Sequence, residues 1–286
     1  MNNLTSMYII SWFGNDTIRS QRAEYHKKQL AWAKNQGLNI FVVAQQYQEV
    51  EYDPEVTYLD YTLAPDVNLL LPAEARNICL RHFYNSDTNF AIMADNDAVL
   101  YDKEQHCDSK DFVKMFNKVN PADLDHVDLF LPINPARVPF TKEHKDNRDT
   151  YDNHFVFKRA TEGKGSFTVI KNFKKFYNNE IYYDEKSFMT SDRKIIPHED
   201  TDFLMSVYEN GYSGFMCTNI VLRELAYAND VSTWAGDTER NSANLVGKSI
   251  IRDKYKLTVT SNGNTNYRPL WKRINTPTKL LVPKGK

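Results

Sequence analysis

Short apolar runs alternate along the chain with polar stretches of helical character. The first two runs, residues 7–13 and 40–44, enclose a polar stretch from about residue 17 to 36, which Gly37 ends. A strand, a helix and a second strand in this order predict two parallel strands joined by a right-handed crossover. No glycine-rich fingerprint follows the first strand, so the pattern does not favour a dinucleotide cofactor. The chain therefore opens as an α/β unit.

The most informative run is NFAIMADNDAVL, residues 89–100. Its apolar part leads directly into Asp95-Asn96-Asp97, and apolar residues resume at Ala98. The preceding segment, 71–87, has apolar residues at helical spacing, so the predicted order is helix, buried strand, and Asp-x-Asp at the carboxyl end of the strand. Open α/β sheets bind ligands at that end, where two carboxylates can hold Mn²⁺ or Mg²⁺ and the cation can hold a diphosphate. A solvated turn is the alternative for a bare Asp-x-Asp motif, but the apolar residues on both sides favour the ligand site.

Ala75-Arg76-Asn77 lies on the predicted helix, directly before the strand that ends in Asp95-Asn96-Asp97. This order resembles the core of the GT-A nucleotide-sugar glycosyltransferases. The resemblance implies an α/β fold of the GT-A type, a mixed, mainly parallel sheet flanked by helices, with a UDP-sugar as donor and Mn²⁺ or Mg²⁺ as cofactor. More narrowly, the length, the order of motifs and the basic end resemble the phage glycosyltransferases that decorate hydroxymethylated pyrimidines in DNA, of the T-even β-glucosyl-hydroxymethylcytosine α-glucosyltransferase type.

A second acidic cluster lies in residues 195–211, IIPHEDTDFLMSVYENG. Asp200 or Thr201 is predicted to cap a helix that Gly211 ends, which places Glu199 and Asp200 at the positive end of the helix dipole. The pair resembles the Glu-Asp element of many GT-A enzymes, which lies beside the acceptor hydroxyl. An ordinary cap and a surface acid are the alternative. The order and separation from the Asp-x-Asp motif favour one catalytic site, in which Glu199 or Asp200 receives the acceptor proton if the reaction inverts configuration.

The metal site is predicted to use Asp95 and Asp97, with Asp95 also contacting the donor. Many GT-A enzymes take a third ligand from a late histidine, but no histidine follows His198 in this chain. The third ligand therefore stays open among His198, Asp237 and water.

Further residues are predicted to bind the donor. Trp12 can stack a base and Arg19 can reach a phosphate or the base edge, although Trp12 also suits a core position. Arg76 adds positive charge at the phosphates, together with one of the late basic residues Lys248, Arg252, Lys254 and Lys256. Asp60 is a candidate ribose contact, with a solvated acid as the alternative. Residues 232–248, polar and rich in small side chains, are predicted to be a loop that orders on ligand binding.

Composition places the chain among ordinary α/β proteins: 286 residues, 41% hydrophobic and 26% charged, without a run of about 18 apolar residues or a secretory signal. The three cysteines lack metal-ligand spacing, and the two in apolar patterns, Cys79 and Cys217, are predicted core residues. We therefore expect a cytoplasmic setting, the host cytoplasm if the protein is phage-encoded, and no membrane partner.

The net charge is −1, yet residues 248–286 hold ten Lys and Arg against one acid. Aromatic residues lie between these charges, as at Tyr267 and Trp271, which suits a nucleic acid as well as a solvated tail.

We expect a glycosyltransferase domain at 1–247, with its nucleotide-sugar half at about 1–133 and its acceptor half at about 134–247. Within it, we predict a helix at 109–119, strands at 129–133 and 215–222, and a long loop at 134–152.

The predicted function is metal-dependent transfer of a sugar, expected to be glucose, from a UDP-sugar to a hydroxyl on double-stranded DNA carrying hydroxymethylcytosine or its glucosylated form. The alternatives are a saccharide or other non-DNA acceptor, a metal-dependent nucleotidyltransferase or phosphatase, and a nucleic-acid-binding protein without catalysis. A second metal site or a phosphate loop would favour the nucleotidyltransferase, and the sequence contains neither. The sugar, and whether configuration is inverted or retained, stay open.

Overall fold

The computed structural model describes residues 5–12, 16–45, 52–102, 107–108, 125–128, 154–160, 163, 165–217, 221–224, 237–262, 265–266 and 279–283. In chain order its elements are β1 (Thr5–Trp12), α1 (Asp16–Asn35), β2 (Asn39–Gln45), β3 (Thr57–Tyr58), α2 (Pro72–Tyr84), β4 (Phe90–Asp95), β5 (Ala98–Asp102), β6 (Cys107–Asp108), β7 (His126–Asp128), β8 (His154–Arg159), β9 (Phe167–Lys171), α6 (Phe173–Tyr177), α7 (Glu199–Glu209), β10 (Gly214–Cys217), β11 (Val221–Glu224), α8 (Asp237–Tyr255) and β12 (Lys279–Pro283).

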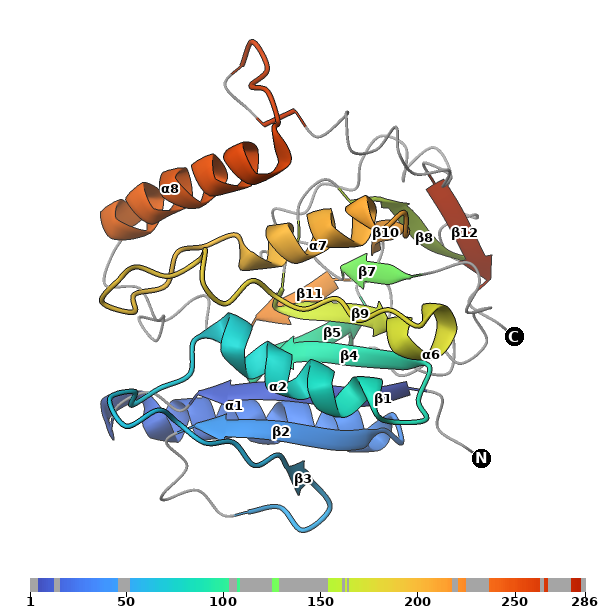
Figure 1. Ribbon diagram of the computed structural model, residues 1–286. Coiled ribbons are helices and arrows are strands. Elements are labelled where there is room, and N and C mark those ends of the chain that lie inside the picture. Colours follow the sequence, from blue (N-terminus) through green and yellow to red (C-terminus); the bar gives the residue numbers. More distant parts are fainter. Residues whose placement is uncertain are drawn as a thin grey trace.

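The main sheet joins nine described strands in the order β12-β8-β10-β7-β9-β4-β1-β2-β3 (Figure 1). Strands β3, β2, β1 and β4 pair in parallel, while β9 lies antiparallel between β4 and β7. Strand β8 is antiparallel to both β10 and β12, and β10 is parallel to β7. Only β8 and β9 therefore run against β1, so seven of these nine strands share one direction. The predicted class, a mixed and mainly parallel sheet flanked by helices, is confirmed.

Alternate residues of the central strands face two different helix layers. On β1, Met7 and Ile9 belong to the core that includes α1 residues, whereas Tyr8 belongs to the core that includes α2 and α7 residues. Strand β4 divides in the same way. This alternation follows from the two-residue period of a strand, and it explains why the central strands are apolar throughout. Helix α1 covers one face of the sheet, and α2 and α7 cover the other (Figure 1).

Helix α8 forms an outer layer against α7. Its residues Ile251 and Tyr255 share a core with Leu204 and Tyr208 of α7. A Cβ atom on Gly247 of α8 would lie 2.1 Å from the carbonyl oxygen of Pro197, so the two segments approach at a distance that only glycine permits. Helix α8 is thereby packed against the turn that precedes α7.

Several predicted elements are confirmed. The opening unit is a parallel β1–β2 pair joined by α1, and Gly37 follows the helix with a φ of 68°. Helix α2, strand β4 and helix α7 lie where the pattern places them, and Gly211 follows α7 with a φ of 78°. Cys79 and Cys217 are buried.

Three predictions are wrong. Residues 237–248 are not a loop but the first part of α8, a helix that packs against α7 through Ile251 and Tyr255 further along and through the close approach of Gly247 to Pro197. The run 215–222 is not one strand: β10 joins the main sheet and β11 joins a second, three-stranded sheet with β5 and β6. The cap of α7 is His198, two or three residues earlier than predicted, because this residue adopts a left-handed conformation with a φ of 88° that turns the chain directly into the helix.

The basic segment is part of the fold where the structure describes it. Residues 248–255 continue α8, and residues 279–283 form β12, the edge strand paired with β8. The predicted helix at 109–119, the strand at 129–133 and the loop at 134–152 lie outside the described residues. None of the described helices combines the length and apolar character needed to cross a membrane.

Candidate active site

Arg76 joins the two acidic clusters that the sequence analysis identified. Its Nη1 donates to Oε1 of Glu199 at 2.8 Å, and its Nη2 donates to Oδ1 of Asp95 at 3.0 Å. Nη2 also lies 3.3 Å from the carbonyl oxygen of Gly165. The end of β4 and the start of α7 therefore meet at one buried guanidinium, although 104 positions separate Asp95 from Glu199 in the chain.

The environment of Arg76 keeps it charged. Its side chain is only 6% exposed, and its Cζ lies 5.4 Å from the centre of the Tyr183 ring. Burial by itself would lower the pKa of Arg76, but the nearby carboxylates, Asp95 foremost, outweigh burial and raise the pKa above its ordinary value. A permanent positive charge is thus fixed beside Asp95 and Glu199.

The local sequence explains how these side chains come together. Pro72 begins α2, and Glu74 accepts a hydrogen bond from the backbone of Leu71 at 2.7 Å, which fixes the first turn of the helix. Arg76 follows in the next turn and points toward the end of β4. On the other side, a Cβ on Gly163 would lie 2.1 Å from the carbonyl oxygen of Asp200, so the segment before β9 can lie against the start of α7 only with glycine there.

The turn after β4 is held by residues of β1 and α1. Asn96 is buried and donates to the Oγ of Ser11 at 3.2 Å and to the carbonyl oxygen of Trp12 at 3.1 Å. Nη1 of Arg22 lies 3.3 Å from Oδ1 of Asn96 and 3.5 Å from Oδ2 of Asp97. Two arginines therefore neutralise the two carboxylates of the motif, Arg76 at Asp95 and Arg22 at Asp97.

Arg22 was missed from the sequence, as was Gln29 on the same helix. Gln29 donates from Nε2 to the carbonyl oxygens of Asp95 and Ala98, at 2.5 and 2.8 Å. The sequence does contain a pattern that could have identified both residues: the polar residues at positions 22, 26 and 29 have the spacing of one helix face. In the structure all three are buried. Polar side chains on a core-facing stripe usually have specific partners.

Trp12 and Arg19 lie on the α1 side of this turn. Trp12 ends β1, and the guanidinium carbon of Arg22 lies 5.2 Å from the centre of its ring. Arg19 is partly buried in the first turns of α1. Their predicted contacts with a nucleotide stay predictions.

The predicted catalytic acids both lie in the first turn of α7. Oδ1 of Asp200 accepts a hydrogen bond from the backbone of Thr201 at 2.6 Å, so this carboxylate interacts with an amide group at the positive end of the helix. Glu199 is 14% exposed and points toward Arg76. The two acids therefore have different partners in spite of their adjacency.

The residues of the Asp-x-Asp motif fit a hard divalent cation. Mg²⁺ and Mn²⁺ prefer carboxylate oxygens and usually retain several water ligands, to which substrate phosphates are added. Within the described parts of the chain, no three His, Cys, Asp or Glu side chains are gathered closely enough to hold a metal. Asp95, Asp97 and His198 therefore do not form such a group, and a cation held by Asp95 and Asp97 would take its remaining ligands from water and substrate. The side chain of Asp237 lies outside the described residues, and the metal ligands stay predictions.

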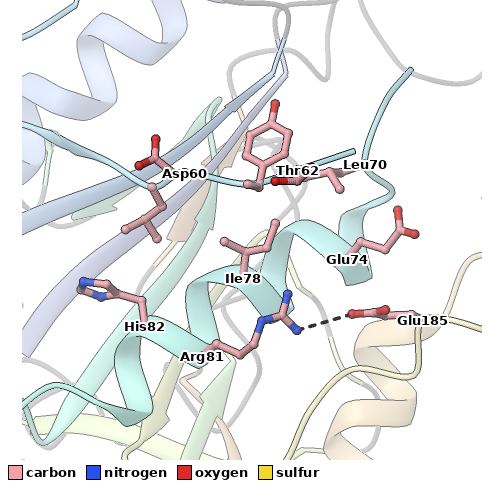
Figure 2. A pocket seen from close by; sticks show the side chains of 10 residues that line it. Asp60, Thr62, Leu70, Glu74, Ile78, Arg81, His82 and Glu185 are labelled. Carbon is pink, nitrogen blue, oxygen red and sulfur yellow. Dashed lines mark ion pairs between the residues drawn. The ribbon is translucent and has the colours of Figure 1, made fainter. Parts of the chain in front are cut away.

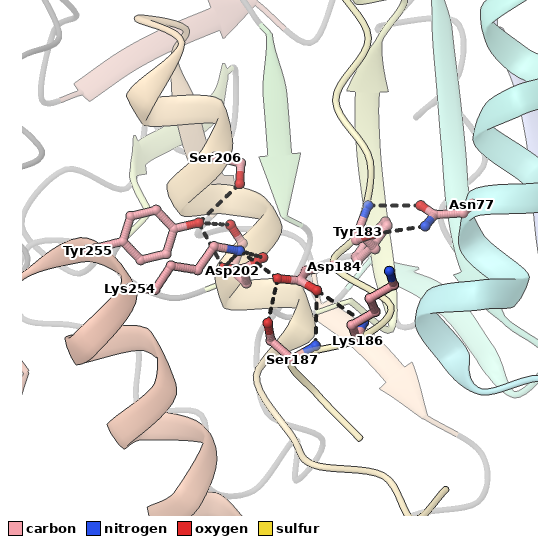
Figure 3. Close-up of polar contacts among 9 residues, drawn as sticks. All are labelled: Asn77, Tyr183, Asp184, Lys186, Ser187, Asp202, Ser206, Lys254 and Tyr255. Carbon is pink, nitrogen blue, oxygen red and sulfur yellow. Dashed lines mark hydrogen bonds and ion pairs between the residues drawn. The ribbon is translucent and has the colours of Figure 1, made fainter. Parts of the chain in front are cut away.

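Of the four late basic residues, Lys254 is already engaged. Its Nζ lies 2.9 Å from Oδ2 of Asp184 and 2.8 Å from Oδ1 of Asp202, between α8 and α7 (Figure 3). Tyr255 donates to Oδ1 of Asp202 at 2.8 Å. Lys254 thus fastens α8 to α7 and is unsuited to a leaving diphosphate. Lys248 is exposed on α8, with no hydrogen bond or ion pair to the described residues.

The same network reaches the Arg76 site. The side chain of Asn77 pairs with the backbone of Tyr183, donating to its carbonyl oxygen at 2.9 Å and accepting from its amide at 2.8 Å (Figure 3). The ring of Tyr183 stacks on Phe203 of α7 at 4.4 Å and lies beside Arg76. Asn77 therefore positions the aromatic wall of the site rather than a ligand.

A pocket of about 490 Å³ lies between α2 and the segment after β3 (Figure 2). Asp60 lines it, together with Ile78, Arg81 and His82 of α2. Nη1 of Arg81 lies 4.0 Å from Oε1 of Glu185, which also lines the pocket. None of the predicted catalytic or metal-binding residues lines this pocket, so the structure does not bring Asp60 to the Arg76 site.

Comparison with known proteins identifies no family. No family model matches the chain, and no curated protein matches it. Among solved structures, similar chains include a Drosophila beta-1,4-galactosyltransferase 7 variant in complex with manganese, UDP-Gal and xylobiose (TM-score 0.38, 13% identity, 84% of this chain and 79% of that chain). A Bacillus anthracis protein described as a glucose-1-phosphate thymidylyltransferase in complex with a sucrose has a TM-score of 0.42 and 9% identity, over 85% of this chain and 95% of that chain.

A third similar chain is the 4-diphosphocytidyl-2C-methyl-D-erythritol synthase of Anaerococcus prevotii, with a TM-score of 0.36 and 12% identity over 84% of this chain and 96% of that chain. All three scores are below 0.5, so these similarities carry no inference about chemistry.

Proposed function

We propose that the protein is a metal-dependent glycosyltransferase of the GT-A type, which transfers a sugar from a UDP-sugar to a hydroxyl group. The observation that carries the proposal is the meeting of Asp95 and Glu199 at Arg76, within 3.0 Å on both sides. A metal-binding motif and a pair of candidate catalytic acids are needed at one place for glycosyl transfer. An unrelated pair of acidic surface clusters would not share a buried arginine.

Each of the site residues has a different role in the proposed reaction. Asp95 and Asp97 supply hard oxygen ligands, and the cation, when bound, stabilises charge on the leaving diphosphate. Arg76 orients Asp95 and keeps a positive charge beside the donor phosphates. Glu199 is engaged with this guanidinium, which favours an electrostatic role for it. Asp200 is then the candidate to receive the proton of the acceptor hydroxyl, if configuration is inverted.

We further propose glucose as the sugar and double-stranded DNA with hydroxymethylated or glucosylated cytosine as the acceptor. This finer proposal is supported by the resemblance of the motif order and by the charge excess of residues 248–286. Lys248 and Arg252 on α8, and Lys256 directly after it, remain available to phosphates once Lys254 is assigned to Asp184 and Asp202. The aromatic and basic residues from 267 to 273 lie outside the described residues.

The decisive experiment measures products from UDP-sugars by ³¹P NMR, with Mn²⁺ and with EDTA. Glycosyl transfer or hydrolysis releases UDP, whereas a nucleotidyltransferase supplied with pyrophosphate converts the UDP-sugar to UTP and a sugar 1-phosphate. Release of UDP that requires Mn²⁺ supports the proposal. Full activity in EDTA contradicts the metal assignment, and the absence of UDP release from every UDP-sugar contradicts the glycosyltransferase itself.

The acceptor is tested by transfer of labelled sugar to unmodified, hydroxymethylated and glucosylated duplexes, beside free saccharides. Phosphate contacts predict binding that weakens steeply between about 50 and 200 mM salt. The variant Arg268→Ala/Lys272→Ala/Arg273→Ala should flatten this salt dependence and leave UDP-sugar hydrolysis unchanged. Labelling of saccharides without labelling of any modified duplex would reject the DNA acceptor and leave the transferase proposal intact.

A further inference from the structure

Helix α1 buries polar side chains against the turn that carries the Asp-x-Asp motif. Arg22 and Gln29 are 7% and 0% exposed. Burying such groups is unfavourable unless they gain specific partners. Gln29 donates to the carbonyl oxygens of Asp95 and Ala98, and Arg22 contacts Asn96, Asp97 and the ring of Trp12 at the end of β1, so these side chains hold this turn.

Gln29 connects the two ends of the turn. Its Nε2 group has two protons, one directed at the carbonyl oxygen of Asp95 and the other at that of Ala98, at 2.5 and 2.8 Å. The amide of Asp95 is fixed in addition by the carbonyl oxygen of Ser166, at 3.0 Å. A single side chain thus connects the last residue of β4 to the first residue of β5.

The oxygen atom of the Gln29 side chain indicates that this residue acts as a hydrogen-bond donor and not as an acceptor. Oε1 of Gln29 is buried and receives no hydrogen bond from the described residues. An unsatisfied buried acceptor is unfavourable. A glutamine is nevertheless present, because a glutamine amide supplies two donors at one nitrogen, as the two carbonyl groups require.

The middle of the turn is held from the same side. Asn96 is tied to Ser11 and Trp12, and Arg22 reaches both Asn96 and Asp97. The backbone of the turn is therefore anchored at its beginning, middle and end. The carboxylates of Asp95 and Asp97, by contrast, are held by arginine contacts that a metal ion can compete for.

We propose that Gln29 is a positioning residue, which sets the spacing of the Asp95 and Asp97 carboxylates for a divalent cation. The inference rests on the proposed function, because it needs the cation. Mg²⁺ and Mn²⁺ require near-octahedral geometry with ligands at about 2.0–2.1 Å. A turn that can widen by a few tenths of an ångström presents its two carboxylates at the wrong separation, and the cation binds more weakly. Partners that orient metal ligands typically change metal affinity by about 10–100-fold when they are removed.

The test is Mn²⁺ binding by electron paramagnetic resonance, on Gln29→Met in the full chain without substrate. Methionine has a similar volume and no donor, so both carbonyl groups lose their partner. Gln21→Met is the matched control, because Gln21 is an exposed residue of the same helix whose Nε2 donates to Tyr25 at 2.6 Å and to no other residue in the described part of the chain. We expect the Kd for Mn²⁺ to rise by about 10-fold or more in Gln29→Met and to be unchanged in Gln21→Met.

A second variant and a second measurement separate positioning from loss of folding. Gln29→Asn keeps a buried amide that is one methylene shorter, and we expect it to fold and to bind Mn²⁺ with intermediate affinity. Where UDP release is measured, excess Mn²⁺ should restore the rate of either variant, which a merely unstable protein would not show. Equal Mn²⁺ affinity in wild type and Gln29→Met overturns the positioning role alone. A wild-type protein that binds no Mn²⁺ overturns the metal assignment as well.

Discussion

Replacing Arg76 with methionine is the strongest single perturbation of the candidate site. Methionine fills much of the same volume but has no charge and no donor, so Asp95 and Glu199 lose their shared partner. Removing one member of a buried ion pair costs about 3–5 kcal/mol, because it leaves a buried charge uncompensated. Asp95 is 32% exposed and Glu199 14% exposed, so water can partly replace the guanidinium at Asp95. We therefore expect a loss near 3 kcal/mol, or a fall in Tm of roughly 6–12 °C.

The matched control is Arg81→Met on the same helix. Arg81 is 56% exposed and lies 4.0 Å from Glu185, so its ion pair contributes less than about 1 kcal/mol. Arg76→Lys provides a second comparison, because it keeps the charge but cannot present two parallel donors to two carboxylates. We expect Arg76→Lys to recover part of the Tm and little of the UDP release.

The assay combines thermal melting and urea titration with UDP release from the same preparations. If Arg76→Met melts within about 2 °C of Arg81→Met, the ion pairs of Arg76 do not hold the ends of β4 and α7 together. If Arg76→Met is destabilised but releases UDP at the wild-type rate, Arg76 is structural and the meeting of the two acidic clusters carries no function.

Three further predictions address the acids and helix α8. Asp97→Asn should abolish Mn²⁺ binding and UDP release and lower stability by about 1–3 kcal/mol, since buried Arg22 loses its counter-charge but keeps its contact with Asn96; an active variant would contradict the metal assignment. Asp200→Ser should lower transfer by about 10²–10⁴ with a stability loss of about 0.3–1 kcal/mol, and a near wild-type rate would leave Glu199 as the catalytic acid. Lys254→Met removes the counter-charge of both Asp202 and Asp184. Burial already raises the pKa of Asp202. Burial would also raise the pKa of Asp184, but its hydrogen bond with Lys254 helps to hold that pKa below the usual range. An acid with a raised folded-state pKa favours folding at lower pH, and one with a lowered pKa favours it at higher pH. The Tm difference between wild type and Lys254→Met should therefore shrink as the pH falls from about 7 to 4, and a constant difference would show that these carboxylates do not depend on Lys254.

The sequence by itself determined the fold class and the elements with a clear period. Strands β1, β2 and β4 are largely apolar because the central part of the sheet is covered on both faces, and that burial is visible in the sequence as apolar runs. The stops at Gly37 and Gly211 follow from a left-handed backbone conformation that glycine adopts without strain. The position of Asp95 at the end of a buried strand followed from the same pattern, since strand direction sets which end carries the turn.

Residues 237–248 were misread because local polarity does not determine whether a segment packs. Helix α8 is mostly polar, and it is held to α7 by a narrow contact that includes Gly247 and the pairing of Lys254 with Asp184 and Asp202. These partners are distant in sequence, so no window along the chain contains the information. The division of 215–222 into two strands of different sheets was hidden for the same reason.

The tertiary structure alone decided how the candidate site is assembled. The sequence predicted that Asp95, Asp97 and Glu199 belong to one site, but not that Arg76 lies between two of them or that Arg22 pairs with the third. It also could not separate Asp60, which lines a different pocket, from the residues around Arg76. The physical reason is that hydrophobic periodicity specifies which face of an element is buried, whereas the partner of a buried polar group depends on the register and packing of elements far apart in the chain.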